Sequence, residues 1–252
     1  MALLEVETVS VVFGGLAALT EVSLALEAGT ICAVIGPNGA GKTTLFNAIS
    51  GYERPRAGTV RLDGRVLSGL PPHAISRLGL RRTFQNGGVF GEMTVLENVM
   101  VGADRATRSS IPGVLFAFRH DRREERRAIA ESRAMLARAG IDRLEQTRMR
   151  DLSFGQQRLV EITRALISRP RVLLLDEPAV GLSQAERDTL ATTLRELAAQ
   201  GIAVLLVEHV IDLVMAVSDR VVVLNFGRVL AEGTPAEVRA DRAVLEAYLG
   251  SA

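Results

Sequence analysis

The sequence is poor in the residues that crosslink small secreted domains and in those that stack on nucleic-acid bases. Its 252 residues contain no tryptophan, one cysteine and only 4% aromatic residues. A single cysteine excludes a disulfide framework within the chain and suits a reducing compartment. Without aromatic platforms, we expect no nucleic-acid partner that binds by base stacking. Cys32 itself lies in an apolar stretch, and we expect it to be a small buried residue.

The sequence also lacks an excess of either charge and lacks a long apolar run. Thirty Lys and Arg residues against 29 Asp and Glu residues give a net charge of +1, which again argues against a nucleic-acid partner. No apolar run approaches the roughly 20 residues that a membrane-spanning helix needs. Glu5 and Glu7 interrupt the start of the chain, so we expect no secretory signal. Any role at a membrane would therefore depend on a partner protein.

The best defined motif is a phosphate-binding loop, or P-loop. It consists of Gly36, Pro37, Asn38, Gly39, Ala40, Gly41, Lys42, Thr43 and Thr44, which fit the pattern G-x-x-x-x-G-K-[ST]. The apolar run 30–35 before it predicts a buried strand, and residues 45–50 after it predict a helix. A glycine-rich turn between such elements directs backbone N–H groups at a polyphosphate. Lys42 is then placed to bind the β- and γ-phosphates, and the Thr43 hydroxyl to bind Mg²⁺.

Acidic residues follow a second buried strand. The apolar run 172–175 ends in Asp176 and Glu177, and acids at a strand end can simply face solvent. Together with a P-loop, however, they form the Walker B arrangement. In it Asp176 holds Mg²⁺ directly or through water, and Glu177 acts on the attacking water as a general base or by orienting it.

Two further polar residues follow strand-like runs. These are Gln85 and His209. Each would more often be structural if it stood alone. Because ligand sites of α/β proteins gather at the carboxyl ends of strands, we expect both in the same site.

Strands and helices alternate over most of the chain. This alternation predicts an α/β fold with a parallel core sheet, and the N-terminal strands predict antiparallel additions. The expected strands include residues 3–12, 21–26, 58–62, 203–207 and 221–224. Capping-box patterns predict helices that begin after Thr94 and after Ser183. Between residues 105 and 150 the strand signals vanish and the charge density rises, so we expect a solvated helical region there, with a docking surface as the alternative.

The order of these motifs resembles that of ATP-binding cassette (ABC) ATPases across essentially the whole chain. Leu152–Gln157, with the letters LSFGQQ, resembles the family signature LSGGQ, with Phe154 in place of the middle glycine. Ser153 also suits a helix N-cap, with Gln156 at the N3 position. The resemblance implies a single domain over residues 1–252, with a P-loop NTPase core sheet of RecA type and an N-terminal antiparallel β subdomain. It also implies an α-helical signature subdomain inserted at approximately residues 100–168.

The resemblance further implies how ATP and Mg²⁺ are bound. Two ATP molecules would lie in a head-to-tail dimer of cassettes, each between one P-loop and the signature residues Ser153, Gly155 and Gln156 of the other subunit. Gln85 matches the Q-loop, which would make it both a catalytic residue and a Mg²⁺ ligand beside Thr43 and Asp176. Lys42, Glu177 and His209, the switch histidine, would complete the catalytic set. Phe13 matches the aromatic residue that stacks on adenine, although a core aromatic at a strand end is the alternative.

A finer resemblance is to the ATPase subunits of branched-chain amino acid importers. It is carried by the residues Arg82–Gln85, Met93–Val99, Gly155–Ile162 and Glu208–His209. It implies integral membrane permease subunits, a second cassette that is identical or different, and a place at the cytoplasmic face of the inner membrane. Importers of urea and other amides use similar ATPases and remain an alternative. Non-transport cassettes of chromosome maintenance or DNA repair carry a very long coiled coil between P-loop and signature, which this chain lacks, and translation-associated cassettes resemble a tandem of two cores, whereas this chain has one. A P-loop kinase would not explain the signature or His209.

Overall fold

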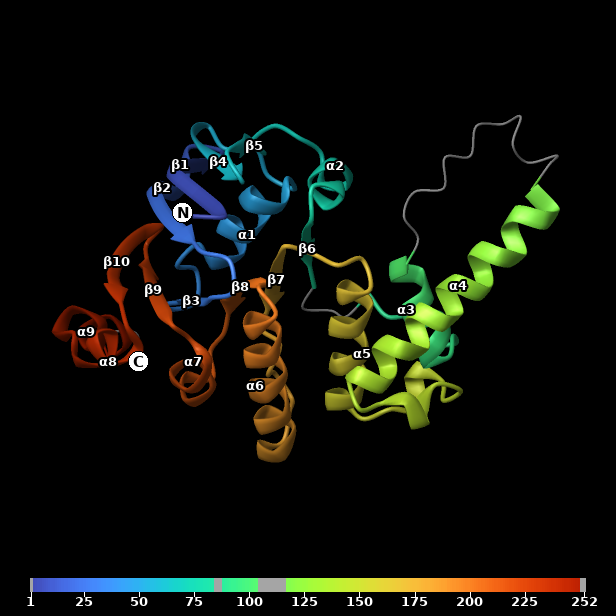
Figure 1. Ribbon diagram of the computed structural model, residues 1–252. Helices are drawn as coiled ribbons and strands as arrows, with labels where there is room; N and C mark the ends of the chain where they lie inside the picture. Colours follow the sequence, from blue (N-terminus) through green and yellow to red (C-terminus); the bar gives the residue numbers. More distant parts are fainter. Residues whose placement is uncertain (1, 84–87, 104–116, 250–252) are drawn as a thin grey trace. The chain divides into compact units, whose positions relative to one another are not determined.

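The computed structural model describes residues 2–83, 88–103 and 117–249 of the chain (Figure 1). The chain divides into two compact units, which are described separately below. The first combines Met1–Gln85 with Arg171–Ala252, and the second is Asn86–Pro170. Gln85, one of the predicted site residues, lies outside the described residues. None of the helices within the described ranges is long and apolar enough to cross a membrane.

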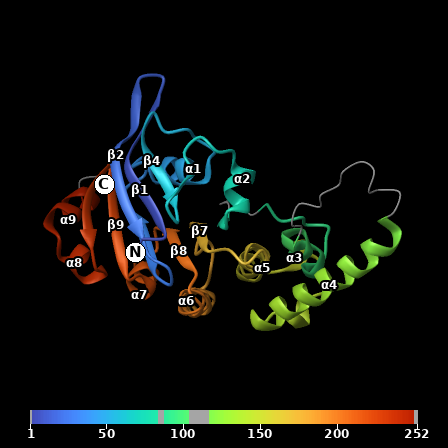
Figure 2. The same ribbon diagram turned by 45° about the horizontal axis from the view of Figure 1, so that its top comes forward.

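The first unit contains a four-stranded antiparallel sheet in the order β2-β1-β4-β5. Its strands are β1 (Leu4–Phe13), β2 (Leu16–Leu26), β4 (Ala57–Leu62) and β5 (Arg65–Val66). The prediction of a strand that begins at residue 21 was wrong, because β2 begins at Leu16. Residues 16–20 lack regular alternation but are extended because they pair with β1, where Phe13 lies opposite Leu16. Figure 2 shows the hairpin that β1 and β2 form.

A six-stranded sheet in the order β10-β9-β3-β8-β7-β6 forms the core of the same unit. Its strands are β3 (Ile31–Ile35), β6 (Leu80–Arg82), β7 (Val172–Asp176), β8 (Ala203–Val207), β9 (Arg220–Asn225) and β10 (Arg228–Gly233). All neighbouring strands are parallel except β9 and β10. The strands β3, β7 and β8 are buried at every position, as expected for parallel strands covered on both faces. The predicted parallel core and antiparallel additions are therefore confirmed.

Helices cover the core sheet and connect its strands. They are α1 (Lys42–Ser50), α2 (Pro72–Arg77), α6 (Gln184–Ala199), α7 (Ile211–Val217), α8 (Pro235–Ala240) and α9 (Arg242–Leu249). The side chains of Leu45, Phe46 and Ile49 in α1 are fully buried and share one apolar cluster with strands of both sheets. Removing three such side chains from water stabilises the fold by several kcal/mol, at about 1.5–3 kcal/mol each. This packing fixes the start of α1, where the P-loop ends.

The second unit is helical in its described part. It contains α3 (Val95–Ala103), α4 (Ala117–Arg138), two short 3₁₀ turns (Asp142–Leu144 and Met149–Asp151) and α5 (Phe154–Leu166). Its apolar core includes the buried side chains Val95, Val99, Leu136, Met149 and Val160. The predicted helix start after Thr94 is confirmed, since Thr94 Oγ1 accepts from the Glu97 amide and Glu97 Oε2 accepts from the Thr94 amide.

Candidate functional site

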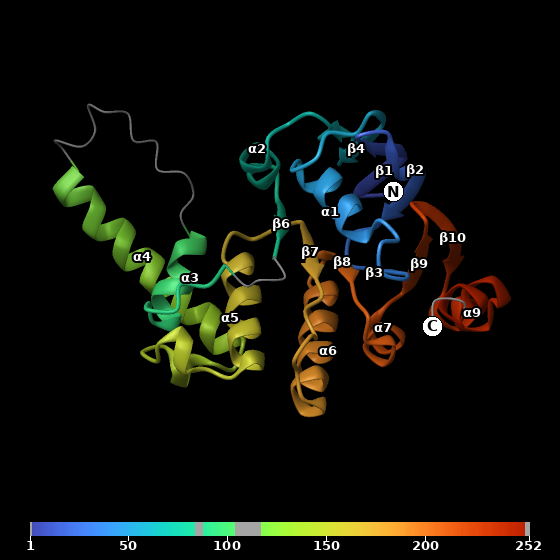
Figure 3. The same ribbon diagram turned by 180° about the vertical axis from the view of Figure 1, so that it is seen from behind.

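The register of the core sheet brings the predicted site residues to one edge. Strand β8 lies between β3 and β7, and Val207 at its end pairs with both Val34 and Asp176. The P-loop after β3, Glu177 after β7 and His209 after β8 therefore leave the sheet side by side. Figure 3 shows these three strands as neighbours in the middle of the sheet. This carboxyl edge is where α/β sheets bind ligands.

The P-loop has a backbone that only glycine can adopt at two positions. Gly36 has φ 152°, and a Cβ there would lie 2.1 Å from the Leu224 carbonyl oxygen. Gly41, at φ 103°, would bring a Cβ within 2.8 Å of the Ala18 carbonyl oxygen. Gly41 is also the N-cap of α1, and it supplies no side chain to accept from the first N–H groups of the helix. The helix therefore begins with exposed donors and a positive dipole end, which suits a phosphate group.

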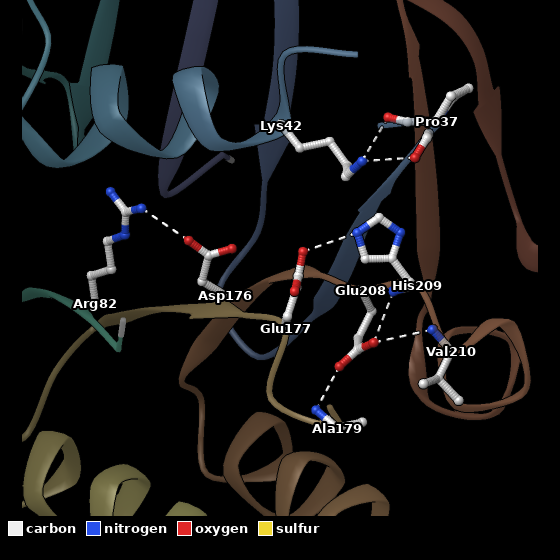
Figure 4. Close-up of polar contacts among 10 residues, drawn as sticks. Pro37, Lys42, Arg82, Asp176, Glu177, Ala179, Glu208, His209 and Val210 are labelled. Carbon is white, nitrogen blue, oxygen red and sulfur yellow. Dashed lines mark hydrogen bonds and ion pairs between the residues drawn. The ribbon is translucent and has the colours of Figure 1, made fainter. Parts of the chain in front are cut away.

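Lys42 is held against its own loop. Its side chain is only 6% exposed. Its Nζ donates to the carbonyl oxygens of Gly36 at 2.7 Å and Pro37 at 2.9 Å (Figure 4). Burial lowers the pKa of Lys42, and the nearby carboxylates of Glu177 and Asp176 partly oppose that change. A positive charge is thus placed at the loop, where it donates to two backbone carbonyl oxygens.

Glu177 and His209 contact each other above the strand ends. His209 Nε2 lies 2.9 Å from Glu177 Oε1 (Figure 4). Glu177 has φ 46°, which is unfavourable for a residue other than glycine, and its N–H donates to the Val207 carbonyl oxygen at 2.8 Å. Such strain of about 1–3 kcal/mol is retained where neighbouring structure fixes the backbone, often at functional sites. Chemically, a carboxylate beside an imidazole can accept a proton from a bound water.

These residues line one cleft. It has a volume of about 450 Å³, and its walls include Lys42, Thr43, Thr44, Glu177 and His209, together with Leu16, Ala17, Ala18, Asn38, Gly39, Ala40, Gly41, Phe226 and Gly227. The size lies in the range of small-molecule sites. Phe13 is 46% exposed at the end of β1, and it is not among the lining residues. Phe226 is 87% exposed beside the P-loop and was not predicted from the sequence.

The predicted signature residues lie in the second unit. Ser153 caps α5, with its Oγ accepting from the Gln156 amide at 3.3 Å and the Gln156 side chain accepting from the Ser153 amide at 3.0 Å. This capping box confirms the predicted N-cap. Gly155 is buried within the first turn of α5, and Phe154 is 74% exposed. The helix N-terminus therefore presents Phe154 to solvent where the family pattern has glycine.

The oxygen donors of Asp176 and Thr43 fit a hard divalent cation. Asp176 is 5% exposed at the end of β7, and Thr43 is exposed in the first turn of α1. Within residues 2–83, 88–103 and 117–249, no cluster of three or more His, Cys, Asp or Glu side chains could hold a metal by itself. Mg²⁺ commonly takes only one or two protein ligands and fills its octahedron with phosphate oxygens and water. The donor set therefore suits a Mg²⁺ ion that binds together with a nucleotide.

Glu208 is a site residue for which the sequence analysis predicted no role, although it belongs to a motif that carries the family resemblance. It is fully buried, and its carboxylate accepts from three backbone amides (Figure 4). Oε1 accepts from Ala179 at 2.6 Å, and Oε2 accepts from His209 at 2.8 Å and Val210 at 3.1 Å. The carboxylate thus joins the loop after Glu177 to the loop that carries His209. The available signal was an acid placed directly after a fully apolar strand, a position where a charge needs partners.

Comparison with known proteins agrees with this geometry. Residues 19–180 match a family model described as ABC transporter, and residues 228–252 match one described as branched-chain amino acid ATP-binding cassette transporter. The chain is 43% identical to the high-affinity branched-chain amino acid transport ATP-binding protein BraF of Pseudomonas aeruginosa. It is 40% identical to the corresponding LivG of Escherichia coli. Both alignments cover 99% of this chain and 98% of the relative.

Solved structures show the same fold. A nucleotide-free ATP-binding cassette from an ABC transporter superposes with a TM-score of 0.87 at 31% identity, over 98% of this chain and 99% of that one. An ATP-binding cassette of an ABC transporter in its ADP conformation gives a TM-score of 0.86 at 30% identity, over 99% of each chain. The chain therefore belongs to the ATP-binding proteins of ABC transporters, as an ATPase of the branched-chain amino acid transport group that includes BraF and LivG.

Proposed function

We propose that this chain hydrolyses Mg-ATP to power a membrane importer of branched-chain amino acids. The observation that carries the proposal is the convergence of Lys42, Glu177 and His209 on one cleft that the P-loop helps to line. The match of residues 228–252 to the branched-chain family model and the names of the relatives support this substrate class.

ATP binding is proposed to use the P-loop and α1 for the phosphates. Lys42 Nζ exchanges its carbonyl partners Gly36 and Pro37 for β- and γ-phosphate oxygens, and the exposed N–H groups at the start of α1 bind the remaining charge. Thr43 and Asp176 hold Mg²⁺, with Gln85 as a further ligand. The metal, when bound, neutralises charge on the transferring phosphoryl group. Phe13 stacks on adenine from the end of β1.

Hydrolysis is proposed to depend on Glu177 and His209. The Glu177 carboxylate orients the attacking water or accepts its proton, an effect of about 10²–10⁴ in rate. His209, 2.9 Å away, fixes the position of that carboxylate. Glu208 supports both residues through its backbone contacts at Ala179, His209 and Val210. The three side chains thus act as one unit at the carboxyl edge of the sheet.

Transport is proposed to follow from nucleotide-dependent pairing of two cassettes. The P-loop of one subunit and Ser153, Gly155 and Gln156 of the other enclose ATP, and hydrolysis releases the pair. The signature residues belong to the helical subdomain at approximately residues 100–168. To shift a gate almost completely, ATP must favour the closed state by about 5.5 kcal/mol, or ~10⁴-fold. The region from Gln85 to Asn98 transmits the motion to permease subunits at the cytoplasmic face of the membrane.

The test is an uptake assay combined with recovery of partners from native membranes. Cells that carry Glu177→Gln should lose uptake of labelled leucine, isoleucine and valine and retain urea uptake. The tagged protein should co-purify with multi-span permeases and a second cassette, identical or different. Loss of urea uptake alone would assign the chain to an amide importer. Recovery of DNA-repair or ribosomal proteins without a permease would refute a transport role.

A further inference from the structure

A large aromatic side chain is exposed at the rim of the cleft. Phe226 is 87% exposed, although it borders a cleft whose other walls include the P-loop and the start of β2. Leu16, the first residue of β2, is 73% exposed and lines the same cleft. Both side chains are apolar, and exposed apolar surface beside a cleft commonly serves to bind a ligand.

The turn that carries Phe226 has an unfavourable backbone for this residue. Asn225 pairs with Arg228, so Phe226 and Gly227 form a two-residue connection between β9 and β10. Their φ angles are 45° and 74°, which are the signs of a type I′ turn, where asparagine, aspartate or glycine is the preferred first residue. A phenylalanine there is strained, and at 87% exposure it gains little from burial. Neither turn geometry nor core packing therefore accounts for an aromatic ring at this position.

Hydrogen bonds anchor the turn to the P-loop. The Gly227 N–H donates to the Ala40 carbonyl oxygen at 3.0 Å, and the Gly227 carbonyl oxygen accepts from the Thr20 amide at 2.8 Å. Ala40 belongs to the P-loop and Thr20 to β2, so the turn is attached to both walls of the cleft. A ring on an anchored backbone loses little freedom when a ligand binds, which favours affinity.

The order of the strands places Phe226 across the P-loop from the residues proposed for hydrolysis. Along the carboxyl edge the order is β9, β3, β8 and β7 (Figure 3). Phe226 follows β9 and the P-loop follows β3, whereas His209 follows β8 and Glu177 follows β7. A nucleotide whose terminal phosphate lies at Glu177 therefore directs its nucleoside toward β9. On that side the cleft is lined by residues without charge, namely Leu16, Ala17, Ala18, Phe226 and Gly227.

We propose that Phe226 is a nucleoside-binding residue, whose ring packs against the base of ATP or ADP while the P-loop holds the phosphates. This inference rests on the proposed binding of ATP at the P-loop, and it adds a second aromatic contact to the one proposed for Phe13. Base stacking tolerates any base, so Phe226 supplies affinity and not selection of adenine. Phe226 also borders a second hollow of about 570 Å³, but of the two only the first cleft is lined by Lys42 and Thr43.

The test is calorimetric titration of the full chain with ADP and with inorganic tripolyphosphate, which has no nucleoside. Phe226→Asn should weaken ADP binding about tenfold and leave tripolyphosphate binding unchanged. Its unfolding temperature without nucleotide should equal or exceed that of the unaltered chain, because asparagine suits the turn. Phe226→Tyr, which keeps the ring, should bind ADP like the unaltered chain. The matched control is Leu245→Ala, at a half-exposed apolar residue of α9 that lines neither hollow, and it should change the binding of neither ligand.

Two results would overturn the proposal. One is a Phe226→Asn variant that binds ADP as tightly as the unaltered chain, which would leave the exposed ring to a protein partner. The other is an equal loss of ADP and tripolyphosphate binding, because the turn would then act only by shaping the P-loop. Lys42→Ala separates this inference from the function beneath it. If Lys42→Ala retains both ligands, the P-loop assignment fails. If it loses both while Phe226→Asn binds ADP normally, only the nucleoside role of Phe226 fails.

Discussion

The replacement Glu208→Gln should uncouple hydrolysis from ATP binding and destabilise the first unit. A glutamine side chain has one acceptor oxygen and one donor amide, whereas Glu208 accepts from three backbone amides through both of its oxygens. In the more favourable orientation of the glutamine amide, its oxygen still accepts from the His209 and Val210 amides. Its NH₂ group then faces the Ala179 N–H, which loses its acceptor. An unsatisfied buried donor costs about 1–3 kcal/mol. The two remaining hydrogen bonds, from His209 and Val210, become weaker because their acceptor is no longer charged. Part of this loss is offset because the variant no longer buries a charge.

The net destabilisation is therefore about 2 kcal/mol, or about 4–8 °C in Tm for a chain of this size. We expect kcat to fall about tenfold, since Glu208 holds the backbone of His209 and of Ala179, two positions after Glu177. The affinity for ATP should stay unchanged because the P-loop is untouched. Thermal unfolding, steady-state ATPase kinetics and nucleotide titration measure the three quantities. The matched control is Glu7→Gln, at an exposed acid paired with Arg61. Unaltered Tm and kcat in Glu208→Gln would refute the reasoning.

Four further results are expected. Lys42→Ala should abolish ATP binding, and full retained turnover would contradict the P-loop assignment. Glu177→Gln should bind ATP, lose about 10²-fold or more in hydrolysis rate and run as a dimer on a sizing column in Mg-ATP; a monomer at saturation would count against the paired cassettes. His209→Ala should slow hydrolysis and spare nucleotide binding, whereas lost binding would indicate a structural histidine. Burial raises the pKa of Cys32 to about 12, so its thiol stays protonated at neutral pH and should resist alkylation until the chain unfolds; rapid labelling of the native protein would show that the β3 region opens.

Much of the site could be predicted because its residues belong to short local sequence motifs. A glycine-rich turn after an apolar strand is enough to assign Lys42 and Thr43 to a phosphate-binding loop. An apolar run that ends in acids is enough to assign Asp176 and Glu177 to the carboxyl end of a buried strand. The burial of Cys32 and the capping boxes at Ser153 and Ser183 were predicted and are confirmed. Each of these features depends on residues within a few positions of one another. Tertiary packing therefore did not alter the local structure that the sequence predicts.

The features that escaped prediction depend on contacts between distant segments. The hydrogen bonds of Glu208 and Arg82 join distant segments, since Glu208 accepts from Ala179 and Arg82 donates to Asn47 and Asp176. Sequence spacing cannot reveal such partners before the strand order is known. The left-handed backbone of Glu177 was equally hidden, because nothing in its residue type favours φ 46°. The early start of β2 reflects pairing with β1 and not an alternating pattern.

The strand that carries the P-loop has a consequence for synthesis of the protein. Strand β3 pairs with β8 and β9, and both neighbours are encoded near the other end of the chain. At about 5–20 residues per second, a ribosome needs about 10–30 s to make the intervening segment. During that interval β3 exposes unpaired edges and apolar faces, and no nucleotide site exists. Nascent chains and truncated products are therefore expected to require chaperone protection and to gain ATP binding only once translation is nearly complete.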